Sequence, residues 1–459
     1  MRRELIHREE GNRSAIAFFA GWAMDGKPFG NLRKSGYDIY LFYDYRTVEP
    51  ELYTGVFGQY DSVALVAWSF GVAVANRLLT GDEEIRIAVN GTAQGVDNQR
   101  GLPKPYNALT LRRLSEATLL SFYKRVFPED VFPDFFTHLP ARPLSELADE
   151  LRVMGDTVFD SPKECWDKVF IGASDLIIPL ANQLKSWEKF HPTVIEKGAH
   201  GIDFQKLLDT EIVNKKIVAQ SFTRKAETYE AHAAVQRQMA SALIDLLTEN
   251  SISVRDRQLL EVGIGTGFLT RLYCDDCPAS ITAVDLADSA TLTEILRSSG
   301  CNFTGEIITA DAERFIAGKK ECYDIILTAS TIQWFNSQRR FLADCASALR
   351  PGGILAIATF APGTFHEISD ITGSSLNYRS GDWYAECVSD LMTMIASRCD
   401  SVTLEFNSPR QLLEHISLTG VNAVDRSAGD VNNARKLMRM LPAKPTLTYN
   451  PIYMIFRKL

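Results

Sequence analysis

The feature that most constrains the fold is a glycine-rich turn between an apolar run and the start of a helix. Residues 259–270 read LLEVGIGTGFLT and place glycines at Gly263, Gly265 and Gly267. Glycines at such a turn allow a ligand to approach the backbone closely and surround it with N–H donors. The G-x-G-x-G spacing differs from the G-x-G-x-x-G of pyrophosphate-binding turns. The segment therefore predicts a ligand-binding α/β sheet, with a dinucleotide site as the competing interpretation.

Acidic residues stand at the ends of the next two apolar runs. Asp285 ends ITAVD, where a carboxylate can bind both hydroxyls of a ribose, and Asp311 follows EIITA. The run YDIILTASTIQWF (323–335) comes next, and LRPGGILAIATF (349–360) is expected to be a helix end, a turn and a fifth strand. Ligands of open α/β sheets bind along the carboxyl ends of the strands, where all these landmarks fall. The ordered series favours a Rossmann-like domain with its ligand at that edge.

Strand and helix patterns alternate along both halves of the chain, which indicates two α/β domains with mainly parallel sheets. An amphipathic helical insert at about residues 106–155 interrupts the first series, and such an insert can form a lid over the carboxyl edge. A long helical pattern opens the second series near residue 217. We expect domains at 1–212 and 217–459. The expected strands are 14–20, 37–43, 63–68, 85–90, 168–171 and 193–196 in the first half, then 258–262, 281–285, 306–309, 323–328 and 354–359, with further apolar runs at 402–406 and 449–456.

Composition excludes several classes of protein. The 459 residues suggest two or three domains, and the net charge of -8 argues against nucleic acid or an anionic membrane as a partner. No apolar run is long enough for a transmembrane helix, and the N-terminal segment lacks the apolar core of a signal peptide. Cys274 and Cys277 form a C-x-x-C pair without a second pair, so no metal site is expected. Reduced thiols and a cytoplasmic location are the expectation.

The first half contains a candidate nucleophile at Ser69. The segment VALVAWSFGVAVA (63–75) reads as a buried strand that turns into a helix of small residues, like a nucleophile elbow, but Ala67 replaces the first glycine of G-x-S-x-G. Asp175 follows the run KVFIG, and His200 follows TVIE, so the order Ser, Asp, His is that of a serine hydrolase on an α/β sheet. The sequence predicts a catalytic triad, and a structural serine at a tight turn is the alternative.

An oxyanion hole requires two N–H groups directed at one point. The first is expected from the backbone of Phe70, the residue that follows the nucleophile. The second is expected from Trp22 in the early turn FFAGWAMD. That turn usually reads His-Gly, and Ala20-Gly21 in its place leaves the backbone geometry available.

The second half resembles the class I S-adenosylmethionine-dependent methyltransferases, and more narrowly malonyl-[acyl-carrier protein] O-methyltransferase of the BioC type. The resemblance implies that Glu261 and the three glycines Gly263, Gly265 and Gly267 frame the methionine end of the cofactor. Asp285 is implied at the ribose, with Asp311 and Ala312 near the adenine. The motifs that carry the resemblance are FTRKAETYEAHAAVQ, STIQWF, FAPGTFHEI, FNSPRQLLEHISLTGVNAV and LTYNPIYMIFRK.

Methyl transfer to a carboxylate requires alignment more than acid–base catalysis, because the nucleophile is already anionic. Tyr229, Gln333 and Trp334 are therefore candidates to position the carboxylate of malonyl-[acyl-carrier protein]. Tyr229 and Trp334 could equally be packing residues. Acyl carrier proteins are acidic, and the basic segment NNARKLMRMLPAK (432–444) is a candidate docking face, with a solvated helix face as the alternative.

The first half resembles pimeloyl-[acyl-carrier protein] methyl ester esterase of the BioG type, through FFAGWAMD, YDYR (43–46), VAWSFGV, GASDLIIPLANQ and GAHGIDF. The two resemblances together imply a fusion enzyme of biotin precursor synthesis: an α/β-hydrolase with a helical lid insert, followed by a class I methyltransferase. Its expected partners are acyl carrier proteins that bear malonyl or methyl-pimeloyl chains. Two alternatives remain: a generic carboxylesterase or thioesterase fused to a small-acid methyltransferase, and an inactive hydrolase-fold docking module on a methyltransferase.

Overall fold

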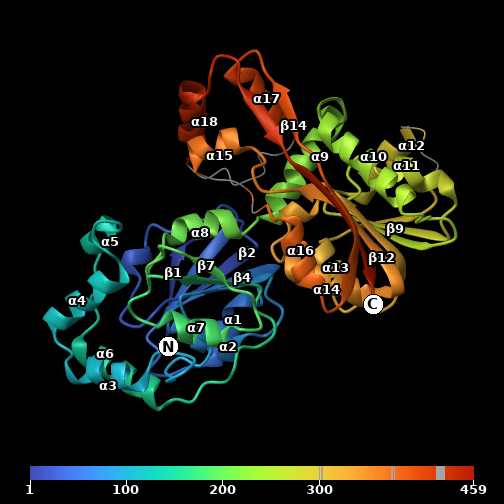
Figure 1. Cartoon of the computed structure of the whole chain (residues 1–459). Helices are drawn as coiled ribbons and strands as arrows, with labels where there is room; N and C mark the ends of the chain where they lie inside the picture. Colours follow the sequence, from blue (N-terminus) through green and yellow to red (C-terminus); the bar gives the residue numbers. More distant parts are fainter. Residues whose placement is uncertain (299, 301–302, 374–375, 377, 420–428) are drawn as a thin grey trace. The chain divides into compact units, whose positions relative to one another are not determined.

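The computed structural model divides the chain into two compact units, Met1–Leu208 and Asp209–Leu459, which are described separately below (Figure 1). Within the described part of the chain, no helix combines the length and the apolar character needed to cross a membrane. The motif FNSPRQLLEHISLTGVNAV ends outside the described residues. The structure describes residues 1–298, 300, 303–373, 376, 378–419 and 429–459, with the backbone alone for 224–228 and 429–433.

The first unit, all of whose residues are described, contains a seven-stranded sheet in the order β1-β3-β2-β4-β5-β6-β7. Strand β1 is antiparallel to β3, and every other neighbouring pair is parallel. The carboxyl ends of β4 to β7 therefore meet at one edge of the sheet. The strands are β1 (Arg2–His7), β2 (Ser14–Phe19), β3 (Tyr37–Tyr43), β4 (Ser62–Trp68), β5 (Ile85–Val89), β6 (Lys168–Gly172) and β7 (Thr193–Ile195).

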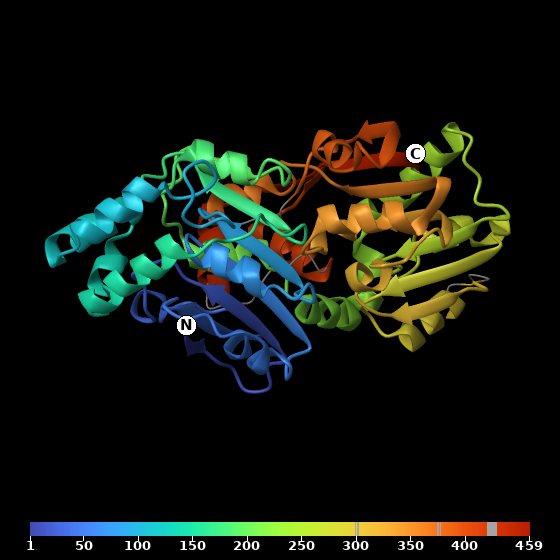
Figure 2. The same ribbon diagram turned by 90° about the horizontal axis from the view of Figure 1, so that it is seen from below.

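Helices cover both faces of this sheet because successive strand residues point to opposite sides. Phe18 packs against Phe204 of α8 on one face, and Phe19 packs against Tyr53 of α1 on the other. The insert forms four helices, α3 to α6, which project to one side of the strands (cyan, Figures 1 and 2). The helices are η1 (Lys27–Phe29), α1 (Pro50–Phe57), α2 (Gly71–Leu78), α3 (Lys104–Arg112), α4 (Glu116–Val126), α5 (Pro133–Thr137), α6 (Leu144–Asp156), α7 (Leu180–Ser186) and α8 (Phe204–Glu211).

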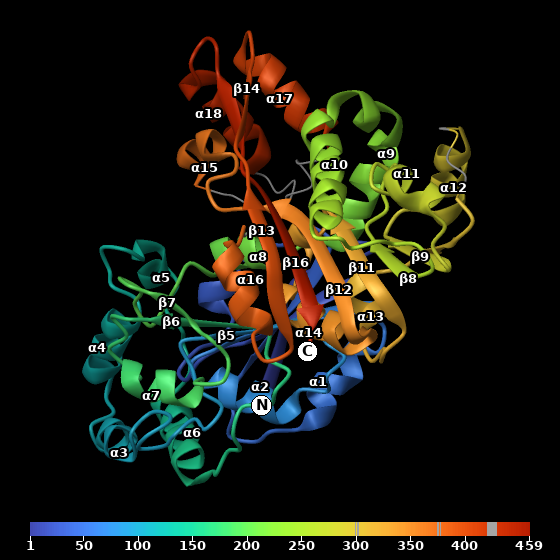
Figure 3. The ribbon, with the colours of Figure 1, turned by 45° about the vertical axis from the view of Figure 1, so that its right-hand side comes forward.

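The main sheet of the second unit, among the described residues, has seven strands in the order β10-β9-β8-β11-β12-β16-β13. Strand β16 is antiparallel to both of its neighbours, β12 and β13 (Figure 3), and the other pairs are parallel. A separate two-stranded sheet pairs β14 with β15. The strands are β8 (Gln258–Val262), β9 (Ser280–Asp285), β10 (Glu306–Thr309), β11 (Tyr323–Ala329), β12 (Leu349–Phe360), β13 (Met392–Cys399), β14 (Val402–Glu405), β15 (Thr446–Tyr449) and β16 (Pro451–Lys458).

Apolar layers lie on both faces of this second sheet as well. Leu259 belongs to a core with Leu243 of α10, whereas Leu260 belongs to a core with Leu342 of α14. Helices α15, α17 and α18 gather with β14 beyond the end of the sheet where β12 finishes (Figures 1 and 3). The helices are α9 (Lys215–His232), α10 (Ala234–Glu249), α11 (Thr270–Tyr273), η2 (Cys274–Asp276), α12 (Ser289–Ser298), α13 (Ala312–Ile316), η3 (Ile332–Trp334), α14 (Gln338–Ala348), α15 (His366–Thr372), α16 (Gly381–Val388), α17 (Pro409–Leu418) and α18 (Gly429–Met440).

Three expectations about elements need correction. The segment 349–353, predicted as helix end and turn, belongs to β12, where the pairing with β11 jumps from Leu349 to Ile354. The run 449–456 is divided between β15 and β16, because the chain changes sheets around Asn450. Strands β1 and β13 were missed: both lie at sheet edges, where β1 exposes most of its residues and carries no continuous apolar pattern.

Candidate functional site

The first candidate site lies at the carboxyl edge of the first sheet, where Ser69 follows β4. Ser69 has a left-handed backbone with φ of 57°, which is uncommon for a residue other than glycine and is typical of a strained functional turn. Its N–H donates to the carbonyl of Val89, and its neighbour Phe70 caps α2. The serine is 9% exposed and borders a cavity.

Three side chains form a continuous chain of hydrogen bonds at this edge. The Ser69 hydroxyl lies 2.8 Å from His200 Nε2, and His200 Nδ1 lies 2.8 Å from Asp175 Oδ2. The carboxylate acceptor fixes the tautomer with the proton on Nδ1, so Nε2 is free to accept the serine proton. His200 and Asp175 are fully buried. The structure thus brings together the three residues that the sequence predicted as a triad, in a geometry that suits nucleophilic catalysis.

Further hydrogen bonds hold the Asp175 carboxylate and the loop of His200 in place. Asp175 also accepts hydrogen bonds from the N–H groups of Ile177 and Ile178 and from the Gln183 side chain. Asn90, directly after β5, donates to the carbonyl of His200 at 2.8 Å. Sequence reasoning missed Gln183 and Asn90; the one available signal was a polar residue directly after a buried strand.

The motif lacks its first glycine, which is replaced by Ala67. The close packing around Ser69 depends on three other glycines, Gly21, Gly71 and Gly91. A Cβ atom added to Gly21 would lie 2.9 Å from the Ser69 Cβ, and one added to Gly91 would lie 2.2 Å from the Ser69 carbonyl oxygen. A Cβ atom added to Gly71 would lie 2.5 Å from the Phe19 carbonyl oxygen. Ala67 is fully buried inside β4, where its methyl group is accommodated. The alanine is therefore compatible with the tight turn.

Trp22 and Phe70 are the two residues expected to form an oxyanion hole. The backbone N–H groups of Trp22 and Phe70 donate to no other residue that the structure describes. Both residues border the cavity that contains Ser69, and the Trp22 indole donates to the carbonyl of Leu147 on α6. Two backbone N–H groups at the border of this cavity are thus without an acceptor among the described residues, and their role as an oxyanion hole stays a prediction.

The cavity beside Ser69 has a volume of about 410 Å³ and extends beneath the insert. Two exposed arginines, Arg113 and Arg125, stand among its lining residues. The remaining lining is mostly apolar. These apolar residues include Leu102, Leu109, Leu114, Leu119, Phe122, Leu151, Met154 and Leu176.

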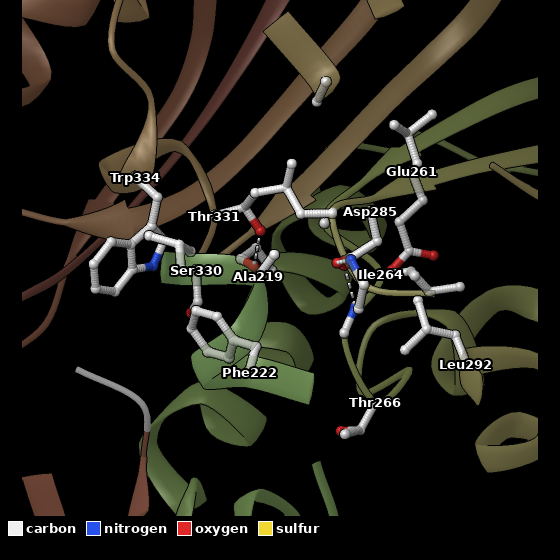
Figure 4. A pocket seen from close by; sticks show the side chains of 18 of the residues that line it. Ala219, Phe222, Glu261, Ile264, Thr266, Asp285, Leu292, Ser330, Thr331 and Trp334 are labelled. Atoms are coloured by element: carbon white, nitrogen blue, oxygen red, sulfur yellow. Dashed lines mark hydrogen bonds between the residues drawn. The ribbon is translucent and has the colours of Figure 1, made fainter. Parts of the chain in front are cut away.

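The second candidate site is a pocket at the carboxyl edge of the second sheet, between the glycine turn and helix α9 (Figure 4). Asp285 accepts hydrogen bonds from the N–H groups of Gly265 and Ala287, and its burial raises the pKa of its carboxyl. Gly263 has φ of 75°, and a Cβ atom there would lie 2.0 Å from Thr331 Oγ1. Glycine is required at this position by backbone and by space.

Glu261 lies at the floor of this pocket, fully buried at the end of β8. Burial raises the pKa of its carboxyl to about 7, against the hydrogen bonds that Tyr273 and Thr270 donate to it. Gly267 is placed differently: its φ is 83°, and a Cβ atom there would meet Leu296 of α12 at 2.2 Å. Gly267 therefore shapes the packing of α12 and is not among the residues that line the pocket.

The lining of the pocket also contains a partly buried ion pair that the sequence did not predict. Asp311 caps α13, and both of its carboxylate oxygens accept from Lys215 Nζ, at 2.6 and 2.7 Å. Lys215 also pairs with Glu313. Ala312 lines the pocket beside this pair.

Aromatic and amide side chains form the opposite wall, where Phe222 and Trp334 lie together (Figure 4). Tyr229 and Trp334 line this pocket, whereas Gln333 lines a smaller adjoining chamber. The Gln333 amide donates to the carbonyl of Ser330 and accepts from Thr359. The structure therefore places Tyr229 and Trp334 in the lining of the pocket, and it places Gln333 in the lining of the adjoining chamber only.

Comparisons with known proteins match the two halves of the chain to different families. A family model described as "Pimeloyl-ACP methyl esterase BioG" matches residues 1–211, and a model described as "Methyltransferase domain" matches residues 260–357. The malonyl-[acyl-carrier protein] O-methyltransferase of Bacteroides fragilis is 30% identical over 471 aligned positions, which cover 97% of this chain and 93% of that protein. That of Chlorobium luteolum is 29% identical over 54% of this chain and 97% of its own length.

Two solved structures are also similar to parts of the chain. BioG from Haemophilus influenzae is 28% identical, with a TM-score of 0.39, and covers 44% of this chain and 94% of its own. A putative methyltransferase from Bacillus halodurans is 15% identical, with a TM-score of 0.36, and covers 47% of this chain and 98% of its own.

S-adenosylmethionine is the cofactor of the methyltransferase domain. The pocket fits this group: two buried carboxylates, Glu261 and Asp285, suit its positive charges and its ribose hydroxyls. The Thr266 hydroxyl is buried at the same pocket without a hydrogen-bond partner among the described residues. The chain belongs to the malonyl-[acyl-carrier protein] O-methyltransferase family, and in it a domain of the BioG pimeloyl-ACP methyl esterase family precedes the methyltransferase domain.

Proposed function

We propose that the chain is a bifunctional enzyme of biotin precursor synthesis. Residues 217–459 methylate the free carboxyl group of malonyl-[acyl-carrier protein]. Residues 1–212 hydrolyse the methyl ester of pimeloyl-[acyl-carrier protein] to pimeloyl-[acyl-carrier protein] and methanol. The observation that carries the proposal is the hydrogen-bonded series of Ser69, His200 and Asp175 beside an apolar cavity, in the same chain as a methyltransferase pocket. The substrates named for the related proteins support it.

In the esterase domain, Ser69 is the nucleophile. His200 Nε2 takes the hydroxyl proton as the serine oxygen attacks the ester carbonyl, and Asp175 stabilises the imidazolium that forms. The same nitrogen then returns the proton to the methoxide leaving group, so methanol departs and an acyl-serine remains. Water repeats the sequence and releases the free acid. The buried Asp175 is suited to this role because its second oxygen is already held by backbone N–H groups.

Trp22 and Phe70 supply the oxyanion hole of this esterase. Their unused backbone N–H groups stabilise the oxygen that becomes negative when the serine attacks. Such donors are effective because they are fixed in place before the reaction starts. Loss of one oxyanion donor costs about 10²- to 10³-fold in kcat.

The helical insert acts as a lid of an α/β-hydrolase and provides the acyl groove. The apolar cavity beneath α3, α4 and α6 is suited to a pimeloyl chain, and the exposed Arg113 and Arg125 at its border suit the phosphate and acidic surface of a carrier protein. The insert is also anchored through Trp22, whose indole bonds to α6. The insert is thereby linked to Trp22, one of the two oxyanion-hole residues.

In the methyltransferase domain, the bound cofactor supplies a methyl group on a sulfonium sulfur. Glu261, Gly263 and Gly265 hold its methionine end, with Gly267 as the packing residue of the same turn. Asp285 binds the ribose. Asp311 and Ala312 lie at the adenine end, with Lys215 fixing the Asp311 carboxylate.

The acceptor carboxylate is positioned by the wall opposite the glycine turn. Tyr229 and Trp334 contribute directly, and Gln333 supports the loop through its bonds to Ser330 and Thr359. These groups align an oxygen with the methyl carbon and exclude water. Methylation removes the charge of the chain end, so the product can enter apolar pockets without burial of a carboxylate.

The carrier protein docks on the methyltransferase domain at the end of α18. Arg435, Lys436, Arg439 and Lys444 are exposed there and carry the positive charge that an acidic partner requires. The exposed side chains of Met438 and Met440 add apolar contact area. The segment 432–444 predicted from the sequence is described from residue 434 onward, with the backbone alone before that.

Two single substitutions test the proposal. Ser69→Ala is expected to abolish hydrolysis of methyl-pimeloyl-[acyl-carrier protein] and to leave methylation of malonyl-[acyl-carrier protein] unchanged, and Asp285→Ala is expected to do the reverse. Full hydrolysis by the Ser69→Ala enzyme would reject the triad. Equal rates on methyl esters with and without carrier protein would favour a generic carboxylesterase instead.

A further inference from the structure

The cofactor pocket continues into a second, smaller chamber. Five residues line both spaces: Phe222, Tyr229, Gln236, Ser330 and Trp334. They form the boundary at which a methyl acceptor must meet the methyl donor. We refer to the smaller space, which is bordered further by Tyr378, Thr419 and Tyr449, as the acceptor chamber.

The described lining of the acceptor chamber includes no lysine or arginine. Lys215, a cation of the neighbouring pocket, is engaged by two carboxylates at the opposite end. Behind the lining, the Nε2 atom of His415 lies 2.8 Å from the Tyr449 hydroxyl. Burial lowers the pKa of His415, with a further lowering by His232, so this imidazole is neutral at pH 7. The part of the lining that the structure describes is therefore polar but uncharged.

Gln236 is the polar side chain at the boundary that has no assigned role. It lies in the first turn of α10 and is 6% exposed. Its amide makes no hydrogen bond to any residue that the structure describes. Because Gln236 lines both cavities, its unpaired amide is available to a ligand group at their junction. The Tyr229 hydroxyl is likewise without a partner among the described residues.

We infer that Gln236 binds the acceptor carboxylate through its side-chain N–H, together with the Tyr229 hydroxyl. This inference rests on the proposed methyltransferase function and names the residue that recognises its substrate. Gln333 does not compete for the role, because its amide is engaged by Ser330 and Thr359. Gln236 ends the motif FTRKAETYEAHAAVQ, which the cofactor site does not otherwise explain.

Neutral donors suit the chemistry of this transfer. A lone pair of the carboxylate oxygen forms the new O–C bond, the electron pair of the broken C–S bond stays on sulfur, and no proton moves. Two opposite charges disappear as the reaction proceeds. A lysine or arginine would stabilise the full carboxylate charge of the ground state more than the reduced charge of the transition state. An amide and a phenol orient the carboxylate with a smaller penalty.

The test measures recognition of the carboxylate separately from activity. The full chain, loaded with S-adenosylhomocysteine to prevent turnover, is titrated with malonyl- and acetyl-[acyl-carrier protein], which differ in the carboxylate. The wild type is expected to bind the malonyl form more tightly. Gln236→Leu is expected to reduce that preference about 10- to 100-fold, as for one lost hydrogen bond to a charged group. Its affinity for S-adenosylhomocysteine is expected to stay within about twofold of the wild type.

Two further variants complete the experiment. Gln238→Leu, on the exposed side of the same helix, is the matched control and keeps the malonyl preference. Gln236→Glu has nearly the same shape as the wild type, so it preserves the fold even if Gln236→Leu does not. It is expected to abolish the preference for the malonyl form, because its carboxylate repels the carboxylate of the acceptor. An undiminished preference in Gln236→Leu or Gln236→Glu overturns the inference. If the wild type methylates no malonyl-[acyl-carrier protein], the proposed function fails instead.

Discussion

Ser69 has a left-handed backbone because the chain reverses between β4 and α2 within one residue. The missing glycine of the elbow motif has no structural consequence, since Ala67 packs inside the strand. Gly91 leaves the space that the Ser69 carbonyl group occupies, although it lies in a different segment of the chain, after β5. No local motif could predict that contact. The triad itself was predictable because its members follow three parallel strands whose ends must meet.

A first prediction compares substitutions at Gly91 and Ala67. Gly91→Ala places a methyl group 2.2 Å from the Ser69 carbonyl oxygen and is expected to lower esterase kcat/KM by about 100-fold or more through displacement of the nucleophile. Ala67→Gly is expected to change it by less than about threefold, with a loss of stability of about 1 kcal/mol. Methyltransferase activity serves as the internal control. Equal effects of the two substitutions would contradict this account of the elbow.

A second prediction concerns protons at the cofactor site. Glu261 has a pKa of about 7, raised by burial, and a bound cation lowers it again. Cofactor binding is therefore expected to release protons at and below pH 7, and the release fades above about pH 8. Calorimetric titrations in buffers of different ionisation enthalpy measure the release. Glu261→Gln is expected to remove most of it, whereas Glu294→Gln on the surface of α12 retains it; an unchanged release in Glu261→Gln contradicts the assignment.

The same shift has a consequence for stability. Because the folded pKa lies above the ordinary 4.5, the protonated carboxyl favours folding at low pH. That contribution is complete below about pH 4.5 and is lost as the pH rises through 7, at most about 3 kcal/mol. The cofactor-free enzyme should show this slope in urea unfolding, and Glu261→Gln should flatten it.

At the scale of elements, the motif YDYR holds the helical insert to the sheet. Asp44 follows β3 and forms ion pairs with Arg142 at 2.9 Å and with Arg46 at 2.7 Å. Arg142 precedes α6 and also pairs with the buried Glu150 of that helix at 2.7 Å. Sequence analysis found no role for Asp44, because Arg142, its partner in the insert, lies far from it in the sequence. The insert is therefore fixed by a buried charge cluster as well as by apolar packing.

A third prediction follows from this cluster. Arg142→Ala leaves Glu150 buried without its counter-ion and removes one of the arginines that pair with Asp44, so it is expected to destabilise the first unit by about 3–5 kcal/mol. Hydrogen exchange of residues 104–156 should accelerate first. Arg152→Ala removes an exposed pair on the same helix and should change stability by less than about 0.5 kcal/mol. Similar effects of both substitutions would show that the cluster does not anchor the insert.

The cluster also responds to pH. Burial alone raises the pKa of Asp44, but the hydrogen bond from Arg46 and the charges of Arg142 and Arg2 outweigh it, so the pKa is lowered overall. The contribution of Asp44 to this attachment is thus complete above its ordinary value of 3.8 and weakens as the pH falls below it, whereas burial raises the pKa of Glu150, so that carboxyl takes up its proton at a higher pH. Exchange rates of the insert at two pH values measure this change.

Most strands were predictable from apolar runs of the right length, because a parallel sheet buries both faces of its strands. The failures are instructive. β1 is an exposed edge strand rich in charge, β13 alternates weakly at the other edge, and β12 begins with a proline and glycine segment that reads as a turn. Pairing with a neighbour decided these cases, and no local pattern encodes that pairing. Gln236 and Lys215 were missed because only the fold brings them to the pocket beside segments that are distant in the sequence.

At the scale of the whole molecule, the two proposed activities oppose each other, so the proposed esterase must spare the short methyl ester. Four additional methylenes in the apolar cavity contribute about 3 kcal/mol, roughly a hundredfold preference for the pimeloyl chain. Leu119→Asn, in the cavity wall, is expected to reduce hydrolysis of the long ester much more than that of the short one. Leu120→Asn on the exposed side of α4 is the control. Equal wild-type rates on both esters would refute chain-length selection.

The most direct test of the central claim is one mass-spectrometric assay of the purified full chain. Malonyl- and methyl-pimeloyl-[acyl-carrier protein] are incubated together, with and without S-adenosylmethionine. The account predicts that the malonyl carrier gains one methyl group only when S-adenosylmethionine is present, and that the pimeloyl carrier loses one in both conditions. A malonyl carrier that stays unmethylated, or a pimeloyl ester that stays intact, would contradict the bifunctional assignment.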